Sequence, residues 1–172
     1  MGIKNIYCQR KLKKELSKVS RTPIVRNIAE IKKVGVIWQP QQKDAVNYLR
    51  NYFNKSHILF RSYCVFDELS NPNPGNNALT TNDLNWWGIP RPEKTQDFMN
   101  SHYDVLLNIA LQQNFVLDYI TALTTADFKV GYSPNMDNYF DLNINIDENQ
   151  DSIFLVKQQI FYLARLNNTI SR

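Results

Sequence analysis

The residues with the clearest chemical pattern are cationic and lie near the start of the chain. Residues 1–33 hold ten lysines and arginines against two acidic residues, so their formal charge is +8. Residues 34–172 hold ten lysines and arginines against fourteen acidic residues, a charge of −4. Such an asymmetry favours a polyanionic partner, because each phosphate that a cation neutralises releases counterions. The side chains expected to contact the polyanion are Arg10, Lys11, Lys13, Lys14, Lys18 and Arg21.

Two kinds of polyanion fit this segment. One is a nucleic acid, RNA or DNA, whose phosphates would lie along the cationic residues, with structured ribosomal RNA as the leading candidate. The other is an anionic membrane surface, which attracts clusters of lysine and arginine. A third interpretation needs no partner: the charges are the solvated face of a helix that Leu12 and Leu16 pack onto the rest of the protein. We favour a ribosome-associated RNA partner over the membrane.

The residue patterns that support catalysis are missing from the sequence. It has no glycine-rich dinucleotide fingerprint, no phosphate loop and no serine in a nucleophile elbow. Neither His57 nor His102 has a cysteine or acidic residue at metal-ligand spacing, so we expect no metal and no cofactor. These absences favour a non-enzymatic binding protein.

The two cysteines and the hydropathy of the chain predict where the protein resides. Cys8 and Cys64 are too few for a disulfide framework and are expected to be free, buried thiols in a reducing compartment. We find no secretory signal and no run of about eighteen apolar residues that would span a bilayer. A cytoplasmic location is therefore expected.

A second candidate site consists of polar residues at the ends of predicted strands. Gln39, Asn108 and Asp147 would line the crevice where α/β sheets bind ligands, and Trp86 and Trp87 could stack on a base or sugar beside them. The alternative function is therefore a binder of a sugar phosphate or nucleotide, or a cryptic transferase-like enzyme. Two simpler interpretations compete: the tryptophans form a hydrophobic lid, and the polar residues belong to helix caps and turns.

The elements that would position these residues alternate between helices and strands. Apolar residues at positions 8, 12, 16 and 19 predict a helix over 3–19 with the cationic residues opposite. Strands are expected at 34–38, 57–66, 104–110, 128–131 and 140–146, and further helices at 42–54, 92–102, 113–125 and from 152 onward. This order predicts an α/β fold of three layers around a mostly parallel, five-stranded Rossmann-like sheet. Residues 34–172 would form one domain and residues 1–33 a basic helical arm.

Several segments resemble a family of small bacterial proteins, of Bacteroidota type, known as a domain of unknown function. They are 83–90 (DLNWWGIP), 103–108 (YDVLLN), 126–131 (ADFKVG), 140–142 (FDL) and 147–149 (DEN), in that order. The basic segment before the Val-Gly-Val strand is also similar to that family. The resemblance implies a cytoplasmic Rossmann-like protein and supplies no activity.

A fainter likeness is to the N-terminal half of heptosyltransferase-type glycosyltransferases, through the Ala-x-Phe-Lys-Val-Gly step at 126–131. The chain departs from that pattern at Asn108, where an aspartate is usual, and similarly at Asn145. It is also too short to include the second, donor-binding domain. The likeness therefore implies an ancestral relationship of fold and not a complete glycosyltransferase.

Overall fold

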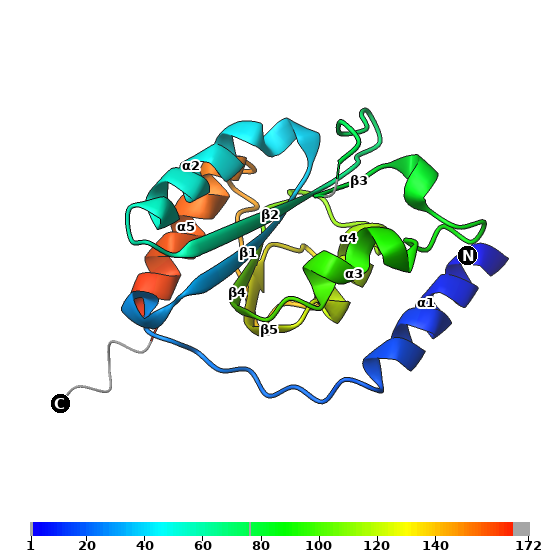
Figure 1. The fold of residues 1–172 in the computed structure, drawn as a ribbon, viewed down its shortest axis with the longest axis horizontal. Helices are drawn as coiled ribbons and strands as arrows, with labels where there is room; N and C mark the ends of the chain where they lie inside the picture. Colours follow the sequence, from blue (N-terminus) through cyan, green and yellow to red (C-terminus); the bar gives the residue numbers. More distant parts are fainter. Residues whose placement is uncertain (1, 76, 167–172) are drawn as a thin grey trace.

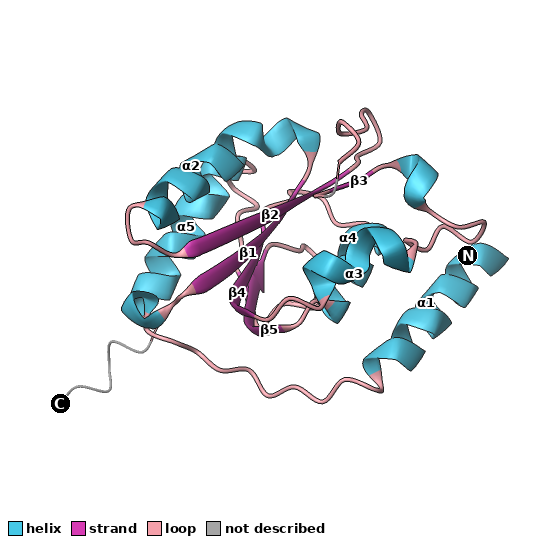
Figure 2. Cartoon of the chain, in the orientation of Figure 1, coloured by secondary structure: helices cyan, strands magenta, loops and turns pink. Residues whose placement is uncertain are grey.

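The computed structural model describes residues 2–75 and 77–166. Its helices and strands alternate along most of the chain, as Figures 1 and 2 show. The strands are β1 (Lys33–Trp38), β2 (Leu59–Val65), β3 (Ala78–Leu79), β4 (Tyr103–Asn108), β5 (Ala126–Gly131) and β6 (Leu142–Asn143). The helices are α1 (Ile3–Leu16), α2 (Lys43–Asn54), α3 (Pro92–Met99), α4 (Phe115–Leu123) and α5 (Ser152–Arg165).

The strands form one parallel sheet in the order β3-β2-β1-β4-β5-β6. The central strands are apolar on both faces because both faces are covered, as is typical of parallel sheets. In β1, Val34 pairs with Phe60 on one side and with Val105 on the other, and Val34, Val36 and Ile37 are fully buried. The α/β class, the parallel sheet and the three layers expected from the sequence are confirmed.

Each face of the sheet carries its own hydrophobic core. Helices α2 and α5 cover one face, where Leu49, Phe53 and Leu155 pack against alternate strand residues. Helices α1, α3 and α4 cover the other face, where Leu12, Phe98 and Leu117 are buried. Because α1 contributes Leu12 to this core, the basic segment is packed against the remainder of the protein at its apolar side.

The sheet has one strand more than the sequence predicted. Ala78–Leu79 pairs with Cys64 and Val65 of β2, in a region where the sequence predicted no strand. The predicted strand over 140–146 was too long, since only Leu142–Asn143 pairs with β5. The alternating Ile144 and Ile146 beyond it are buried in the core without belonging to a strand, which explains why the pattern looked strand-like.

The first helix is also shorter than predicted. It ends at Leu16, and Val19, expected on its apolar face, is half exposed. Within the described residues no helix is both long enough and apolar enough to span a bilayer.

Candidate functional site

Five side chains form a row along one side of α1. Lys4, Tyr7, Lys11, Lys14 and Lys18 are spaced by three, four, three and four residues, which places them on one side of a helix with 3.6 residues per turn. Ser17 keeps a right-handed helical conformation after the helix ends, so Lys18 continues the row. We call these five residues the basic row.

The basic row begins beside the two tryptophans of the 85–90 loop. The Lys4 ammonium lies 4.8 Å from the centre of the Trp86 ring, and the rings of Tyr7 and Trp87 are 4.4 Å apart. The Cys8 thiol donates to the Trp87 carbonyl oxygen at 3.0 Å, and its burial raises its pKa. Residues far apart in the sequence thus combine cations with aromatic rings on one surface.

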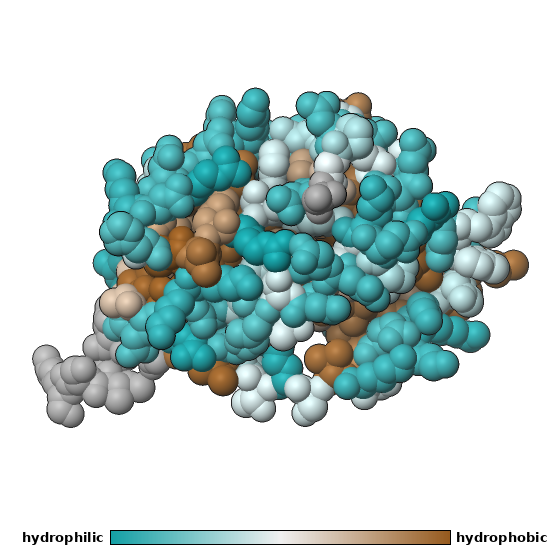
Figure 3. Space-filling view, viewed as in Figure 1, coloured by the Kyte–Doolittle hydropathy of each residue, from teal (hydrophilic) through white to brown (hydrophobic). Residues whose placement is uncertain are grey.

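Local turn chemistry holds the tryptophans outward. The Asn85 side chain accepts hydrogen bonds from the backbone N–H groups of Trp87 and Ile89, and Gly88 supplies the positive φ that the turn requires. Trp86 is consequently 81% exposed, although tryptophan is a large apolar residue. Pale and hydrophobic side chains are visible where α1 begins, and hydrophilic ones follow along its outer surface (Figure 3).

Glu15 is the acidic residue that accompanies the basic row. It lies 3.1 Å from Lys11 and 2.8 Å from Lys18. The hydrogen bond from Lys18 lowers the pKa of Glu15, and the hydrogen bond to Glu15 raises the pKa of Lys11. Within residues 2–75 and 77–166, Arg10, Lys13 and Lys14 form no ion pair, so their side chains are available to a partner.

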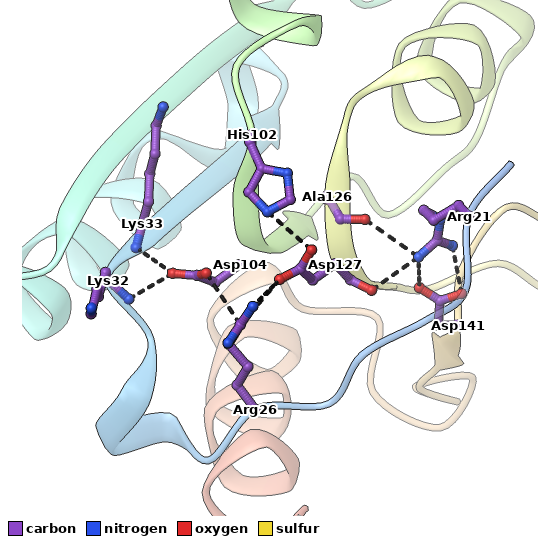
Figure 4. A network of polar contacts seen from close by, with 9 residues as sticks. All are labelled: Arg21, Arg26, Lys32, Lys33, His102, Asp104, Ala126, Asp127 and Asp141. Atoms are coloured by element: carbon purple, nitrogen blue, oxygen red, sulfur yellow. Dashed lines mark hydrogen bonds and ion pairs between the residues drawn. The ribbon is translucent and has the colours of Figure 1, made fainter. Parts of the chain in front are cut away.

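Arg21 lies apart from the other predicted polyanion contacts. Its guanidinium donates two hydrogen bonds to the Asp141 carboxylate, at 2.6 and 2.8 Å, and another to the Asp127 carbonyl oxygen at 3.1 Å. A bidentate pair of this kind is geometrically specific. Its partners are therefore groups of the protein itself, and its role is to attach the extended segment after α1 to β5 (Figure 4).

A second arginine repeats this attachment a few residues later. Arg26 lies 2.7 Å from Asp127 and 3.3 Å from Asp104, at the amino ends of β5 and β4 (Figure 4). Asp104 also accepts the backbone N–H groups of Lys32 and Lys33. Arg21 and Arg26 thus attach the segment that follows α1 to the sheet, so they differ in role from the cationic residues before position 20.

His102, Asp104 and Asp127 come close enough together to ligate a metal ion, which the sequence spacing did not suggest. His102 Nε2 lies 3.0 Å from Asp127, and Arg26 contacts both carboxylates. Because the Arg26 guanidinium already contacts both acids, we interpret the cluster as the attachment point of the N-terminal segment (Figure 4).

The predicted crevice residues do not come together. Gln39 does line a cavity beyond the carboxyl ends of β1, β2 and β4. Asn108 is fully buried instead, where its side-chain amide donates to Gln113 and Thr121 and its oxygen accepts the Ala110 N–H. It shapes the loop after β4, which is the turn interpretation that the sequence left open.

Asp147 and the two tryptophans lie elsewhere. Asp147 accepts a 2.5 Å hydrogen bond from the Tyr132 hydroxyl and lines a separate hollow with Phe154. Trp86 and Trp87 lie beside α1, because the 85–90 loop precedes α3 on the face that α1 also covers. Of the five residues predicted for the crevice, the structure places Gln39 alone at the cavity beyond β1, β2 and β4.

The family of unknown function DUF6913 matches residues 4–166. The chain belongs to this family. No curated protein and no solved structure matches it. The expected resemblance to a family of unknown function is confirmed, while the bacterial origin and the glycosyltransferase likeness stay predictions.

The DUF6913 match includes α1 and the tryptophan loop, so both halves of the candidate interface belong to the family region. Sequence reasoning named Lys11, Lys14 and Lys18 but missed Lys4 and Tyr7. The spacing of three and four residues from Lys18 back to Lys4 was the signal that could have found them. Their proximity to Trp86 and Trp87 had no signal in the sequence.

Proposed function

We propose that this protein is a non-enzymatic, cytoplasmic RNA-binding protein that holds unpaired nucleotides on the basic row. The observation that carries the proposal is Trp86, which is 81% exposed and has the Lys4 ammonium 4.8 Å from its ring centre. Proteins that bind single strands combine a line of cations with aromatic rings on which bases stack. The basic row supplies the cations and Trp86 the platform.

Unpaired RNA suits this surface better than duplex. A base stacks on an aromatic side chain only when it is free of its own helix, as in loops, bulges and ends. The row continues from Trp86 through Lys11 and Lys14 to Lys18, so phosphates of successive nucleotides can follow it. Loops of ribosomal RNA are one source of such strands, in agreement with the ribosome-associated partner expected from the charge.

The membrane alternative is weaker because of how α1 is packed. A helix that lies on a membrane buries its apolar face among the lipids. Here that face, with Cys8 and Leu12, is already buried against the protein. Exposed apolar residues of α1 are confined to its first two turns, at Ile3, Ile6 and Tyr7. Most of the other exposed residues of α1 are lysine or arginine.

Fractionation of native lysate on a sucrose gradient tests the proposal in the cell. We expect the protein to sediment with RNA-containing particles and to move to the top of the gradient after RNase treatment or at high salt. Sedimentation unaffected by RNase, together with binding to vesicles containing phosphatidylserine, would favour the membrane instead. A protein that stays at the top without RNase would contradict both.

Substitution of Trp86 tests the stacking step with purified protein. We expect Trp86→Ala to weaken binding of a labelled oligouridylate by about 1–3 kcal/mol, the usual contribution of one stacked base. Tyr48→Ala is the control, since Tyr48 is 39% exposed on α2, across the sheet. Equal affinities for the Trp86 variant and the wild type would refute base stacking at this position.

A further inference from the structure

The cavity beyond the carboxyl ends of β1, β2 and β4 has an unusual lining. It has a volume of about 410 Å³, within the range of small-molecule sites. Six of the ten glutamines of the chain line it, from separate segments. The lining residues are Gln39, Gln41, Gln42, Asp67, Glu68, Leu69, Leu111, Gln112, Gln113, Asn114 and Gln150. We propose that this cavity, which we call the glutamine crevice, binds a small polyhydroxylated molecule that carries an amine, such as an amino sugar.

The fold opens the glutamine crevice where ligand sites of parallel sheets usually lie. Strands β1 and β4 are neighbours, but the helices that follow them, α2 and α4, lie on opposite faces of the sheet. The two connections therefore diverge, and a gap forms between them at the carboxyl ends. Residues 39–42 form one wall of this gap and residues 111–114 the other.

Some of the amides hold the walls in place. The backbone N–H of Gln39 donates to the Gln42 side-chain oxygen at 2.8 Å, and the two side chains form a reciprocal cap. The Gln113 side chain is occupied on both ends, since it accepts from Asn108 and donates to Ala110 and Tyr132 carbonyl oxygens. These contacts fix the shape of the crevice before any ligand binds.

Other amides remain available for a ligand. Gln41 and Gln112 are exposed, and their side chains have no hydrogen-bond partner within the described ranges. Asn114 uses its side-chain oxygen to cap α4 by accepting the Leu117 N–H, which leaves its amide hydrogens for the crevice. Amide groups both donate and accept, so they match hydroxyl groups, which do the same.

Asp67 decides the charge that the crevice accepts. Its Oδ1 accepts the backbone N–H groups of Leu69 and Ser70, but its Oδ2 is buried and has no hydrogen-bond partner. No hydrogen bond offsets the charge on this oxygen, so the carboxylate favours a cation in the adjacent crevice. Glu68 adds a second carboxylate to the lining, and the lining contains no lysine, arginine or histidine.

The two carboxylates argue against the sugar phosphate or nucleotide expected from the sequence. A phosphate in the crevice would meet Asp67 and Glu68 and no cationic side chain to offset them. An ammonium group would instead be attracted by both carboxylates. The same position in the fold that binds phosphates in many α/β proteins therefore selects the opposite charge here.

A matched series of hexoses tests the proposal by NMR, with the side-chain amide signals of Gln41 and Gln112 as reporters. Glucosamine, glucose and glucose 6-phosphate share one ring and differ in charge. We expect affinity to decrease in that order. Asp67→Asn should weaken glucosamine binding about 10–100-fold, because it removes one of the two negative charges that attract the amine. Asp137→Asn, an exposed site elsewhere, should leave it unchanged.

A second variant distinguishes the loss of a negative charge from a disturbance of the 67–70 turn, in which Asp67 accepts hydrogen bonds. The Glu68 side chain is exposed and forms no ion pair within the described residues, so Glu68→Gln should weaken glucosamine binding without affecting the turn. Tighter binding of glucose 6-phosphate than of glucosamine would overturn the proposal. So would the failure of all three sugars to shift the reporters, or glucosamine binding that neither variant weakens.

Discussion

The net charge of the basic row predicts how strongly RNA binding should depend on salt concentration. Among its four lysines, Lys4 and Lys14 are the two that form no ion pair with Glu15, whereas Lys11 and Lys18 share that carboxylate. The row therefore carries a net charge of +3. If each net charge neutralises one phosphate of a single strand, the logarithm of the association constant should fall with the logarithm of salt concentration with a slope of about −2.1.

Removing Lys4 and Lys14 leaves one net charge in the row. In the variant Lys4→Gln/Lys14→Gln the slope should therefore fall to about −0.7. The two slopes differ by about 1.4. If the variant and the wild type bind equally at 1 M salt, the variant therefore binds about 25-fold more weakly at 0.1 M. The fold should be unaffected, because both side chains are exposed.

Fluorescence anisotropy of a labelled oligouridylate, measured at several potassium chloride concentrations, gives the slope directly. The matched control is Lys43→Gln/Lys55→Gln, which removes the same charge from exposed positions at the two ends of α2, across the sheet. A wild-type slope in the Lys4 and Lys14 variant would refute the reasoning. An equal loss in the control would show that total charge matters and the row does not.

Three further predictions concern the scaffold. Leu12→Ala should lower the free energy of unfolding in urea by about 2–5 kcal/mol, because Leu12 is fully buried between α1 and the body; a loss close to zero would mean that α1 is not docked. Asn108→Asp should lower it by about 2–4 kcal/mol, since the side chain then no longer donates to Gln113 and Thr121; unchanged urea unfolding would contradict this structural role. Burial lowers the pKa of Lys129 to about 7, and its ammonium caps α4 by donating to two carbonyl oxygens. The unfolded chain keeps that proton up to about pH 10, so unfolding takes up a proton above pH 7 and stability should rise from pH 7 to pH 9. Lys129→Met should flatten this rise, and parallel curves for the two proteins would refute the linkage.

The N-terminal segment divides its charges between two roles. Residues up to Lys18 expose their cations on a helix that is held by its apolar side. Arg21 then pairs with Asp141, directly before β6, and Arg26 pairs with Asp104 and Asp127 at the amino ends of β4 and β5. A rigid attachment of this kind reduces the entropy that a flexible arm would lose on binding. The charge count alone did not distinguish these two roles, so the sequence analysis assigned Arg21 to the polyanion contacts.

The glutamine crevice lies at the carboxyl ends of the strands, whereas the ion pairs of Arg26 lie at the amino ends of β4 and β5. The basic row, on α1, lies on the face of the sheet that α3 and α4 also cover. The proposed small molecule and the proposed RNA would therefore use separate surfaces. Their tests are independent, because no residue is common to the basic row and the crevice lining.

The sequence by itself determined the α/β class, the parallel sheet and the approximate bounds of most elements. These follow from patterns that repeat within one element, such as the continuous apolar run of β1 or the spacing of Cys8 and Leu12 along α1. Such patterns report which face of an element is buried, a property set by neighbouring residues. The high proportion of lysine and arginine before position 34 is likewise evident from the sequence alone.

Only the tertiary structure decided which of the candidate residues work together. Arg21 pairs with Asp141, 120 positions away, and Cys8 meets the Trp87 carbonyl 79 positions away. No local pattern encodes such pairs, because they depend on how the helices pack on the sheet. The same packing buries Asn108, which has a structural role. It also places the tryptophans beside the basic row, whereas the sequence predicted them in the crevice. It also assembled six distant glutamines around one cavity, since parallel strands bring all their carboxyl ends to one edge.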